Sequence, residues 1–171
     1  MTPNAETVLG LHPSSRGFGW ALFEDAQSLL DWGTVDIRND KNATALSRIE
    51  FLLDKHQPAV LAMERHDAAG TRRSQRIGRL YAAIAERATA RGISVQRYSR
   101  SEISSSPHLK GARTREEVAS AVADCLNVLR PRLPKPRPIW VGERSGMSLF
   151  CAAACALTYY ASRADFPLRE P

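Results

Sequence analysis

The chain has 171 residues, of which 43% are hydrophobic and 25% are charged, as in ordinary globular domains. This composition excludes a disordered tail, a collagen-like fibre and a coiled coil, and the sequence has no run of about 18 apolar residues that would span a membrane. Lysine and arginine total 24 against 18 acidic residues, a formal charge of +6. Such an excess favours a polyanionic partner, most commonly nucleic acid.

Length and cysteine content set the expected organisation and compartment. We expect one domain over residues 1–171, because a chain of this size buries one sizeable core and not two. Cys125, Cys151 and Cys155 form no disulfide framework, and the first residues show no secretory pattern. We therefore expect a reduced, cytoplasmic protein.

The first 40 residues read as three consecutive strands separated by turn residues, over residues 7–13, 18–24 and 29–38. The connections are too short for a parallel crossover, so the three strands are expected to form an antiparallel meander. A helix opened by Asn42 follows and ends before Pro58. The apolar run at 59–64 predicts a central strand parallel to the first strand.

The second half alternates helices with one more strand. We expect a helix over residues 71–91, closed by Gly92, and a strand over residues 93–99. Thr114 and Glu117 have capping-box spacing, and an amphipathic pattern continues to Leu129. The prolines of residues 130–138 predict a non-helical basic connection, and a last helix runs from about 145 to 161. The order predicts an α/β fold, a mixed five-stranded sheet with helices on both faces.

Five segments in chain order resemble the RuvC-type Holliday-junction resolvases of the ribonuclease H-like superfamily. They are VLGLHPSSR (8–16), GFGWAL (17–22), LAME (61–64), KGARTREEV (110–118) and SLFCAAACAL (148–157). The resemblance implies a ribonuclease H-like fold, a homodimer, and a metal-dependent endonuclease that uses Mg²⁺ or Mn²⁺. It also implies that the basic loop with Lys110, Arg113 and Arg115 approaches the DNA backbone.

The departures from this family fall on its catalytic carboxylates. By the resemblance, the four carboxylate positions correspond to His12, Glu64, Ser148 and Cys151, and only Glu64 is acidic. Two-metal phosphodiester hydrolysis holds two ions about 3.5–4 Å apart, and Mg²⁺ requires hard oxygen ligands. Imidazole, hydroxyl and thiol in place of three carboxylates remove three negative charges. The sequence therefore predicts a catalytic centre that is largely lost.

Alternative roles for these residues remain open at this stage. Glu64, His12 and Cys151 are all acceptable Zn²⁺ ligands, and Glu143 or Asp67 could supply a carboxylate to the vacated site. His12 and Cys151 could also form a nucleophilic pair. Each residue also has a structural interpretation. Glu64 would accept hydrogen bonds, His12 would occupy the former Asp position without a catalytic role, and Cys151 would be a small apolar residue of the core.

The helix expected over residues 71–91 carries the strongest charge pattern. At 100° per residue, six arginines fall within roughly one third of its circumference, namely Arg72, Arg73, Arg76, Arg79, Arg87 and Arg91. With the basic loop, this face could read a phosphate backbone without sequence specificity. The alternative is a solvated face paired with Glu86 and other acids.

Three functions follow. The favoured one is a nucleic-acid-binding protein, with DNA preferred over RNA and structure read rather than sequence, whose RuvC-like nuclease centre has been lost. The second is an active metal-dependent endonuclease with altered ligands. The third is an interaction protein whose basic face meets an acidic protein.

Overall fold

The computed structural model describes residues 6–66, 72–135 and 146–164, without the side chains of Arg72, Arg73 and Ala164. A five-stranded sheet has the order β3-β2-β1-β4-β5. The strands are β1 (Val8–Ser14), β2 (Gly17–Asp25), β3 (Ser28–Asp36), β4 (Val60–Glu64) and β5 (Ser94–Tyr98). β1, β2 and β3 are antiparallel, and β4 and β5 run parallel to β1. The predicted mixed sheet, with its meander followed by parallel strands, is confirmed.

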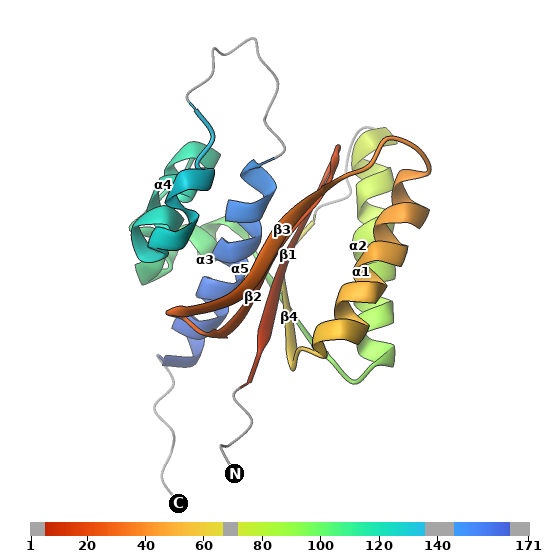
Figure 1. Cartoon of the computed structure of the whole chain (residues 1–171), viewed down its shortest axis with the longest axis horizontal. Coiled ribbons are helices and arrows are strands. Elements are labelled where there is room, and N and C mark those ends of the chain that lie inside the picture. Colours follow the sequence, from red (N-terminus) through yellow and green to blue (C-terminus); the bar gives the residue numbers. More distant parts are fainter. Residues whose placement is uncertain (1–5, 67–71, 136–145, 165–171) are drawn as a thin grey trace, which may run out of the picture.

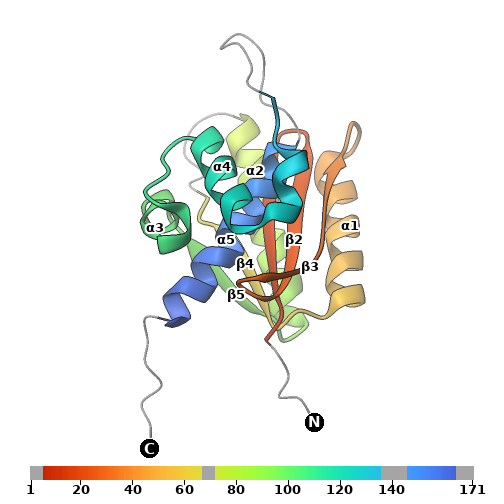
Figure 2. The ribbon, with the colours of Figure 1, turned by 60° about the vertical axis from the view of Figure 1, so that its left-hand side comes forward.

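Helices cover both faces of this sheet (Figure 1). α1 (Lys41–His56) and α2 (Arg72–Ala90) lie on one face, and α5 (Met147–Ala164) lies on the other. α4 (Arg115–Cys125) packs against the outer side of α5, and the short α3 (Arg100–Ser105) lies beside α5, next to α4 (Figure 2). Successive side chains of a strand point to opposite faces of the sheet. The strands therefore contribute to two hydrophobic cores, one on each face.

Two glycines allow α5 to lie unusually close to the sheet. A Cβ on Gly10 would collide with the backbone of Ala152, and a Cβ on Gly19 would collide with the backbone between Ser148 and Leu149. The facing side of α5 is rich in alanine and cysteine, all buried. Small residues on both elements therefore bring the first half of α5 against β1 and the start of β2.

The structure corrects several expected boundaries. α1 begins at Lys41 and not with Asn42 as a cap; Asp40, in the left-handed conformation, precedes the helix without a side-chain cap bond. α4 ends at Cys125, and residues Asn127–Arg132 form a 3₁₀ helix (η2) that includes Pro131. The prediction that residues 130–138 are non-helical is therefore wrong for 130–132. The short 3₁₀ turn η1 (Pro107–Leu109) and helix α3 had not been predicted.

Among the helices of the described residues, none combines the length and hydropathy that crossing a bilayer requires.

Candidate functional site

The site is built where β1 and β4 end side by side. Leu11 pairs with Met63 in the parallel register, so the next residues, His12 and Glu64, lie beside each other. Nδ1 of His12 is 3.9 Å from Oε2 of Glu64, which is too long for a hydrogen bond. Two side chains 52 positions apart in the sequence are thus adjacent because parallel strands end at the same edge.

α5 brings the next two positions toward this edge. The backbone of Ser148 lies over Gly19, and Gly19 pairs with His12 across β1 and β2. Cys151, three residues further along α5, lines the same cavity as Glu64. Ser148 and Cys151 are both buried. The close approach of α5 therefore gathers the four positions implied by the family resemblance at one end of the sheet.

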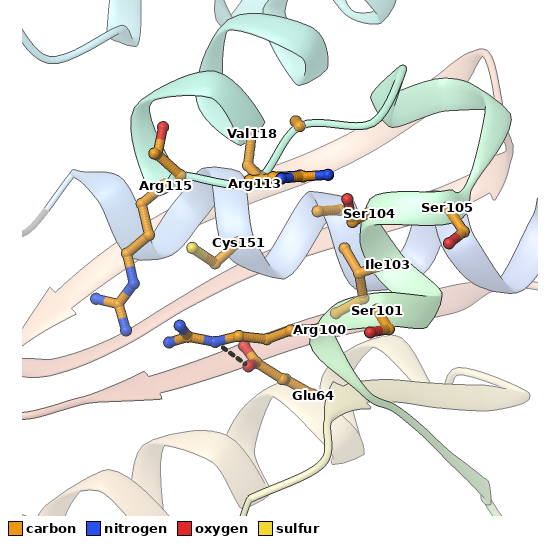
Figure 3. A pocket seen from close by; sticks show the side chains of 13 residues that line it. Glu64, Arg100, Ser101, Ile103, Ser104, Ser105, Arg113, Arg115, Val118 and Cys151 are labelled. Atoms are coloured by element: carbon orange, nitrogen blue, oxygen red, sulfur yellow. Dashed lines mark hydrogen bonds and ion pairs between the residues drawn. The ribbon is translucent and has the colours of Figure 1, made fainter.

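An arginine is bonded to the carboxylate of the site, Glu64. Nε of Arg100 donates to Oε1 of Glu64 at 3.1 Å, and Figure 3 shows this bond with Cys151 facing it from α5. Arg100 is the first residue of α3, which begins with a reciprocal capping box between Ser99 and Glu102. Because Glu64 pairs with Tyr98 across β4 and β5, a helix starting just after β5 places its first side chain at Glu64.

A second arginine reaches the same place from the opposite wall. Arg115 is the first residue of α4, where Thr114 accepts from the backbone N–H of Glu117 and the Glu117 carboxylate accepts from that of Thr114. This reciprocal cap fixes the direction in which α4 starts. In Figure 3 the Arg115 side chain extends from α4 toward the Arg100–Glu64 pair.

His12 is held neutral. Burial, together with the charges of Arg115 and Arg100, lowers the pKa of His12 to about 3. The 3.9 Å contact to Glu64 is therefore not an ion pair at neutral pH. Among the described residues, the buried Nδ1 of His12 has no hydrogen-bond partner. A buried polar atom without a partner costs free energy, and such atoms are uncommon in native proteins.

An aromatic pair closes the site on the side of α2. The ring of Tyr81 stacks on that of His66, with centroids 5.0 Å apart, and Nε2 of His66 lies 2.9 Å from the Ser74 carbonyl oxygen. Burial raises the pKa of Tyr81 far above its ordinary value, with the charges of Cys155 and Glu64 adding to the effect. Tyr81 and His66 thus form a rigid wall near Glu64.

Two hollows meet at Glu64. The larger has a volume of about 710 Å³ and lies between α3, α4 and α5. Among the described residues, its charged lining residues are Glu64, Arg100, Arg113 and Arg115, three positive charges against one negative. The smaller, of about 330 Å³, shares Glu64, Arg100 and Arg115 and reaches His12, His66 and Tyr81. The electrostatic character of the site is therefore positive.

The basic residues of the loop expected to approach DNA line two different hollows. Arg113 and Arg115 line the larger hollow. Lys110 lines a different hollow, together with the acidic side chains Glu116, Glu117 and Asp124.

The arginines of the predicted row on α2 differ in their surroundings. Arg79 is exposed, whereas Arg76 donates to the side chain of Asn42 in α1 at 2.8 Å. Arg87 and Arg91 bond to acidic residues of α1, Glu50 and Asp54. At the C-terminal end of the row the arginines therefore face acidic side chains of α1, as in the alternative of a face paired with acids. The side chains of Arg72 and Arg73 lie outside the described residues.

The donor set does not suit the two Mg²⁺ ions implied by the family resemblance. Glu64 is bonded to a guanidinium, His12 is a buried neutral imidazole, and Cys151 is a thiol. Across residues 6–66, 72–135 and 146–164, no three His, Cys, Asp or Glu side chains are grouped so as to hold a metal ion. Asp67 and Glu143, the expected substitutes, lie outside the described residues.

Sequence reasoning missed Arg100, His66 and Tyr81 as parts of the site. Arg100 had a usable signal, because Ser99 and Glu102 have the capping-box spacing directly after the strand expected at 93–99. Tyr81 lies on the buried side of α2. The position of a buried aromatic next to a carboxylate of another strand depends on tertiary packing and had no local signal.

Comparisons with known proteins agree on one relationship. No protein-family model matches the chain. It is 27% identical over 136 residues to the crossover junction endodeoxyribonuclease RuvC of Oleidesulfovibrio alaskensis, covering 75% of this chain and 82% of that protein.

Solved structures extend this likeness to almost the whole fold. Thermus thermophilus RuvC in complex with Holliday junction substrate matches with a TM-score of 0.68 and 20% identity, covering 92% of this chain and 95% of that chain. A second Thermus thermophilus RuvC structure has the same TM-score at 21% identity, covering 93% and 96%. The fowlpox virus Holliday junction resolvase matches with a TM-score of 0.59 at 12% identity, covering 91% and 99%.

Proposed function

Because the chain belongs to the RuvC-type family, we propose that it is a nucleic-acid-binding protein that has kept the resolvase fold and lost the metal-dependent cutting centre. Its partner is DNA, recognised by backbone and shape, and branched DNA is the first substrate to test. The relatives are a crossover junction endodeoxyribonuclease and a resolvase solved with a Holliday junction, which supports this choice.

One observation carries the proposal: the retained carboxylate is already neutralised by the protein. Glu64 accepts a hydrogen bond from Arg100 at 3.1 Å, and Arg115 stands close enough to lower the pKa of His12. A divalent cation at this place would share Glu64 with the guanidinium of Arg100 and lie near that of Arg115. Mg²⁺ is held in proteins by carboxylates and substrate phosphates, so the positive lining disfavours it.

The same lining suits a polyanion. Arg100, Arg113 and Arg115 provide charge-assisted donors that match phosphate oxygens. Such contacts position a duplex without reading its sequence, and each neutralised phosphate increases the dependence of affinity on salt.

The test measures binding and cleavage of the same substrates. A labelled four-way junction, a duplex and a single strand are each incubated with the protein, with chelator or with Mg²⁺, Mn²⁺ or Zn²⁺. We expect salt-dependent binding, tightest for the junction, and no cleavage under any condition. Absence of binding to all three substrates contradicts the proposal, as does cleavage by wild type that is lost in Glu64→Gln.

A second candidate, an endonuclease with altered metal ligands, rests on the unpartnered Nδ1 of His12. This nitrogen is buried and faces Glu64 at 3.9 Å, and imidazole with carboxylate is an acceptable ligand pair for Mn²⁺ or Zn²⁺. Because Cys151 is not grouped with His12 and Glu64 as a third ligand, the set would need a ligand from outside the described residues, such as Glu143. Cleavage that requires Mn²⁺ or Zn²⁺ and is lost in both His12→Gln and Glu64→Gln would select this candidate.

A further inference from the structure

The larger hollow differs from a metal site in the sign of its charge and in how that charge is arranged. Three arginines and one carboxylate line it, and the side chains of Arg100 and Arg115 lie toward the carboxylate in Figure 3. From this arrangement we infer that the hollow binds one phosphate group directly on Arg100 and Arg115, without a metal ion, and that Glu64 is an internal counter-ion which the phosphate displaces. The inference rests on the proposed function, because nucleic acid is the source of the phosphate.

The exposure of the two partners shows which one a ligand reaches first. The Arg100 side chain is 74% exposed, whereas that of Glu64 is 19% exposed. Arg100 donates its Nε to Glu64, and a guanidinium has four further N–H donors in a planar fork. A phosphate entering from solvent therefore meets Arg100 on its open side, and the carboxylate lies behind the arginine.

The second arginine gives the phosphate a second point of attachment. Arg115 lines both hollows, as do Glu64 and Arg100. It comes from α4, across the hollow from α3, and extends toward Arg100 in Figure 3. Two guanidinium groups approaching from opposite walls are the geometry that holds a tetrahedral anion with several oxygens.

The remaining lining suits the groups attached to a phosphate. The hollow, at about 710 Å³, falls within the size range of small-ligand sites and can take a sugar as well as the phosphate. Ser101, Ser104 and Ser105 supply hydroxyl groups on the α3 side, and Ile103 and Val118 supply apolar contact. This mixture accepts a nucleotide unit and contains no feature that selects a base.

Glu64 weakens the binding that its neighbours create. A phosphate that reaches Arg100 comes within a few ångströms of the carboxylate and is repelled by it. At neutral pH, replacement by glutamine removes this charge and leaves a side chain of the same shape. Two unit charges about 4 Å apart interact strongly enough, even in water, to change affinity by about fivefold. Glu64→Gln is therefore expected to bind more tightly than wild type.

The experiment compares four variants in chelator, using fluorescence anisotropy with a labelled four-way junction at fixed salt. Glu64→Gln is expected to tighten binding by about fivefold or more. Arg100→Gln and Arg115→Gln each lose a charge-assisted contact and weaken binding by about tenfold or more. Arg48→Gln, which removes an exposed charge on α1 at the other face of the sheet, is the matched control and stays within about twofold.

Two further readouts separate the sources of the signal. Addition of Mg²⁺ at constant ionic strength is expected to leave the wild-type affinity unchanged, whereas a metal-bridged phosphate would bind more tightly. Junctions with and without 5′-phosphates distinguish an internal phosphodiester from a terminal phosphate. An equal effect of Glu64→Gln on both identifies the internal one, and an effect confined to phosphorylated ends identifies the terminal one.

The failures are distinguishable. If all four variants bind the junction like wild type, the phosphate site is overturned while the proposed function stands. If Glu64→Gln binds more weakly than wild type, the counter-ion role is overturned. If wild type binds no nucleic acid, both proposals fail together. Misfolding cannot imitate the expected gain of affinity in Glu64→Gln, and thermal unfolding of the two arginine variants shows whether their losses are local.

Discussion

The close approach of α5 to the sheet makes Gly10→Ala an informative perturbation. A Cβ at this position would collide with the carbonyl oxygen of Ala152 and lie 2.9 Å from its carbonyl carbon and 3.3 Å from the Cβ of Ala156. Carbon atoms pack at about 3.5 Å or more, so the helix backbone would have to move by at least about 0.6 Å, the difference between 3.5 and 2.9 Å.

Helix backbone cannot rotate away as a flexible side chain can, so the clash is relieved only by moving α5 off the sheet. Forcing extra volume into a packed core costs about 1–3 kcal/mol, and we expect the upper half of that range. For a chain of this length 1 kcal/mol corresponds to about 2–4 °C in Tm. Gly10→Ala should therefore lower Tm by roughly 4–12 °C.

Thermal unfolding followed by circular dichroism measures this shift. The matched control is Gly146→Ala, because a Cβ there would meet only the Pro134 side chain, at an ordinary 3.9 Å. The control should melt within about 2 °C of wild type, as a neutral surface change does. A Gly10→Ala protein that melts with the control would refute the close packing of β1 against α5.

Three further predictions concern the surroundings of the site. Thr114→Ala removes an N-cap bond and should cost about 1 kcal/mol in a denaturant titration; an unchanged midpoint would contradict the cap. Burial lowers the pKa of His12 to about 3 in the folded protein, whereas in the unfolded chain it is about 6.5. Between these two pH values His12 is protonated only in the unfolded chain. Stability conferred by neutral His12 is therefore full above pH 6.5 and is lost as pH falls toward 3, by at most about 1.4 kcal/mol per unit. His12→Gln should remove that slope from the free energy of unfolding, and parallel pH profiles would contradict the assignment. Arg91→Gln should leave DNA affinity within about twofold of wild type, since Arg91 is engaged by Asp54 and Glu50 and not by a phosphate; a large loss in anisotropy would restore the arginine row as a DNA-binding face.

Much of the fold follows from local pattern and connection length. Short turns after β1 and β2 require antiparallel neighbours, and the apolar run of β4 requires cover on both faces. The adjacency of His12 and Glu64 follows directly, because each ends one of two parallel neighbouring strands. The capping box at Thr114 likewise identified the start of α4.

The chemical character of the site needed tertiary structure. A six-residue helix such as α3 is too short to show a hydrophobic period. The capping-box spacing of Ser99 and Glu102 marks where it starts, but does not show that Arg100 bonds to Glu64. Helical periodicity placed the arginines of α2 on one face, but it did not say that α1 presents Glu50 and Asp54 to that face. The sequence showed that only one of the four carboxylate positions is acidic, and the structure adds that Arg100 donates a hydrogen bond to that residue, Glu64.

A Mn²⁺ titration followed by electron paramagnetic resonance tests the central claim most directly, because the free ion gives a signal that binding diminishes. The claim is that guanidinium groups have replaced cations at the retained carboxylate. Wild type and Glu64→Gln should then leave the free-ion signal equally undiminished. Saturable Mn²⁺ binding to wild type that disappears in Glu64→Gln would contradict the account and identify a working metal site.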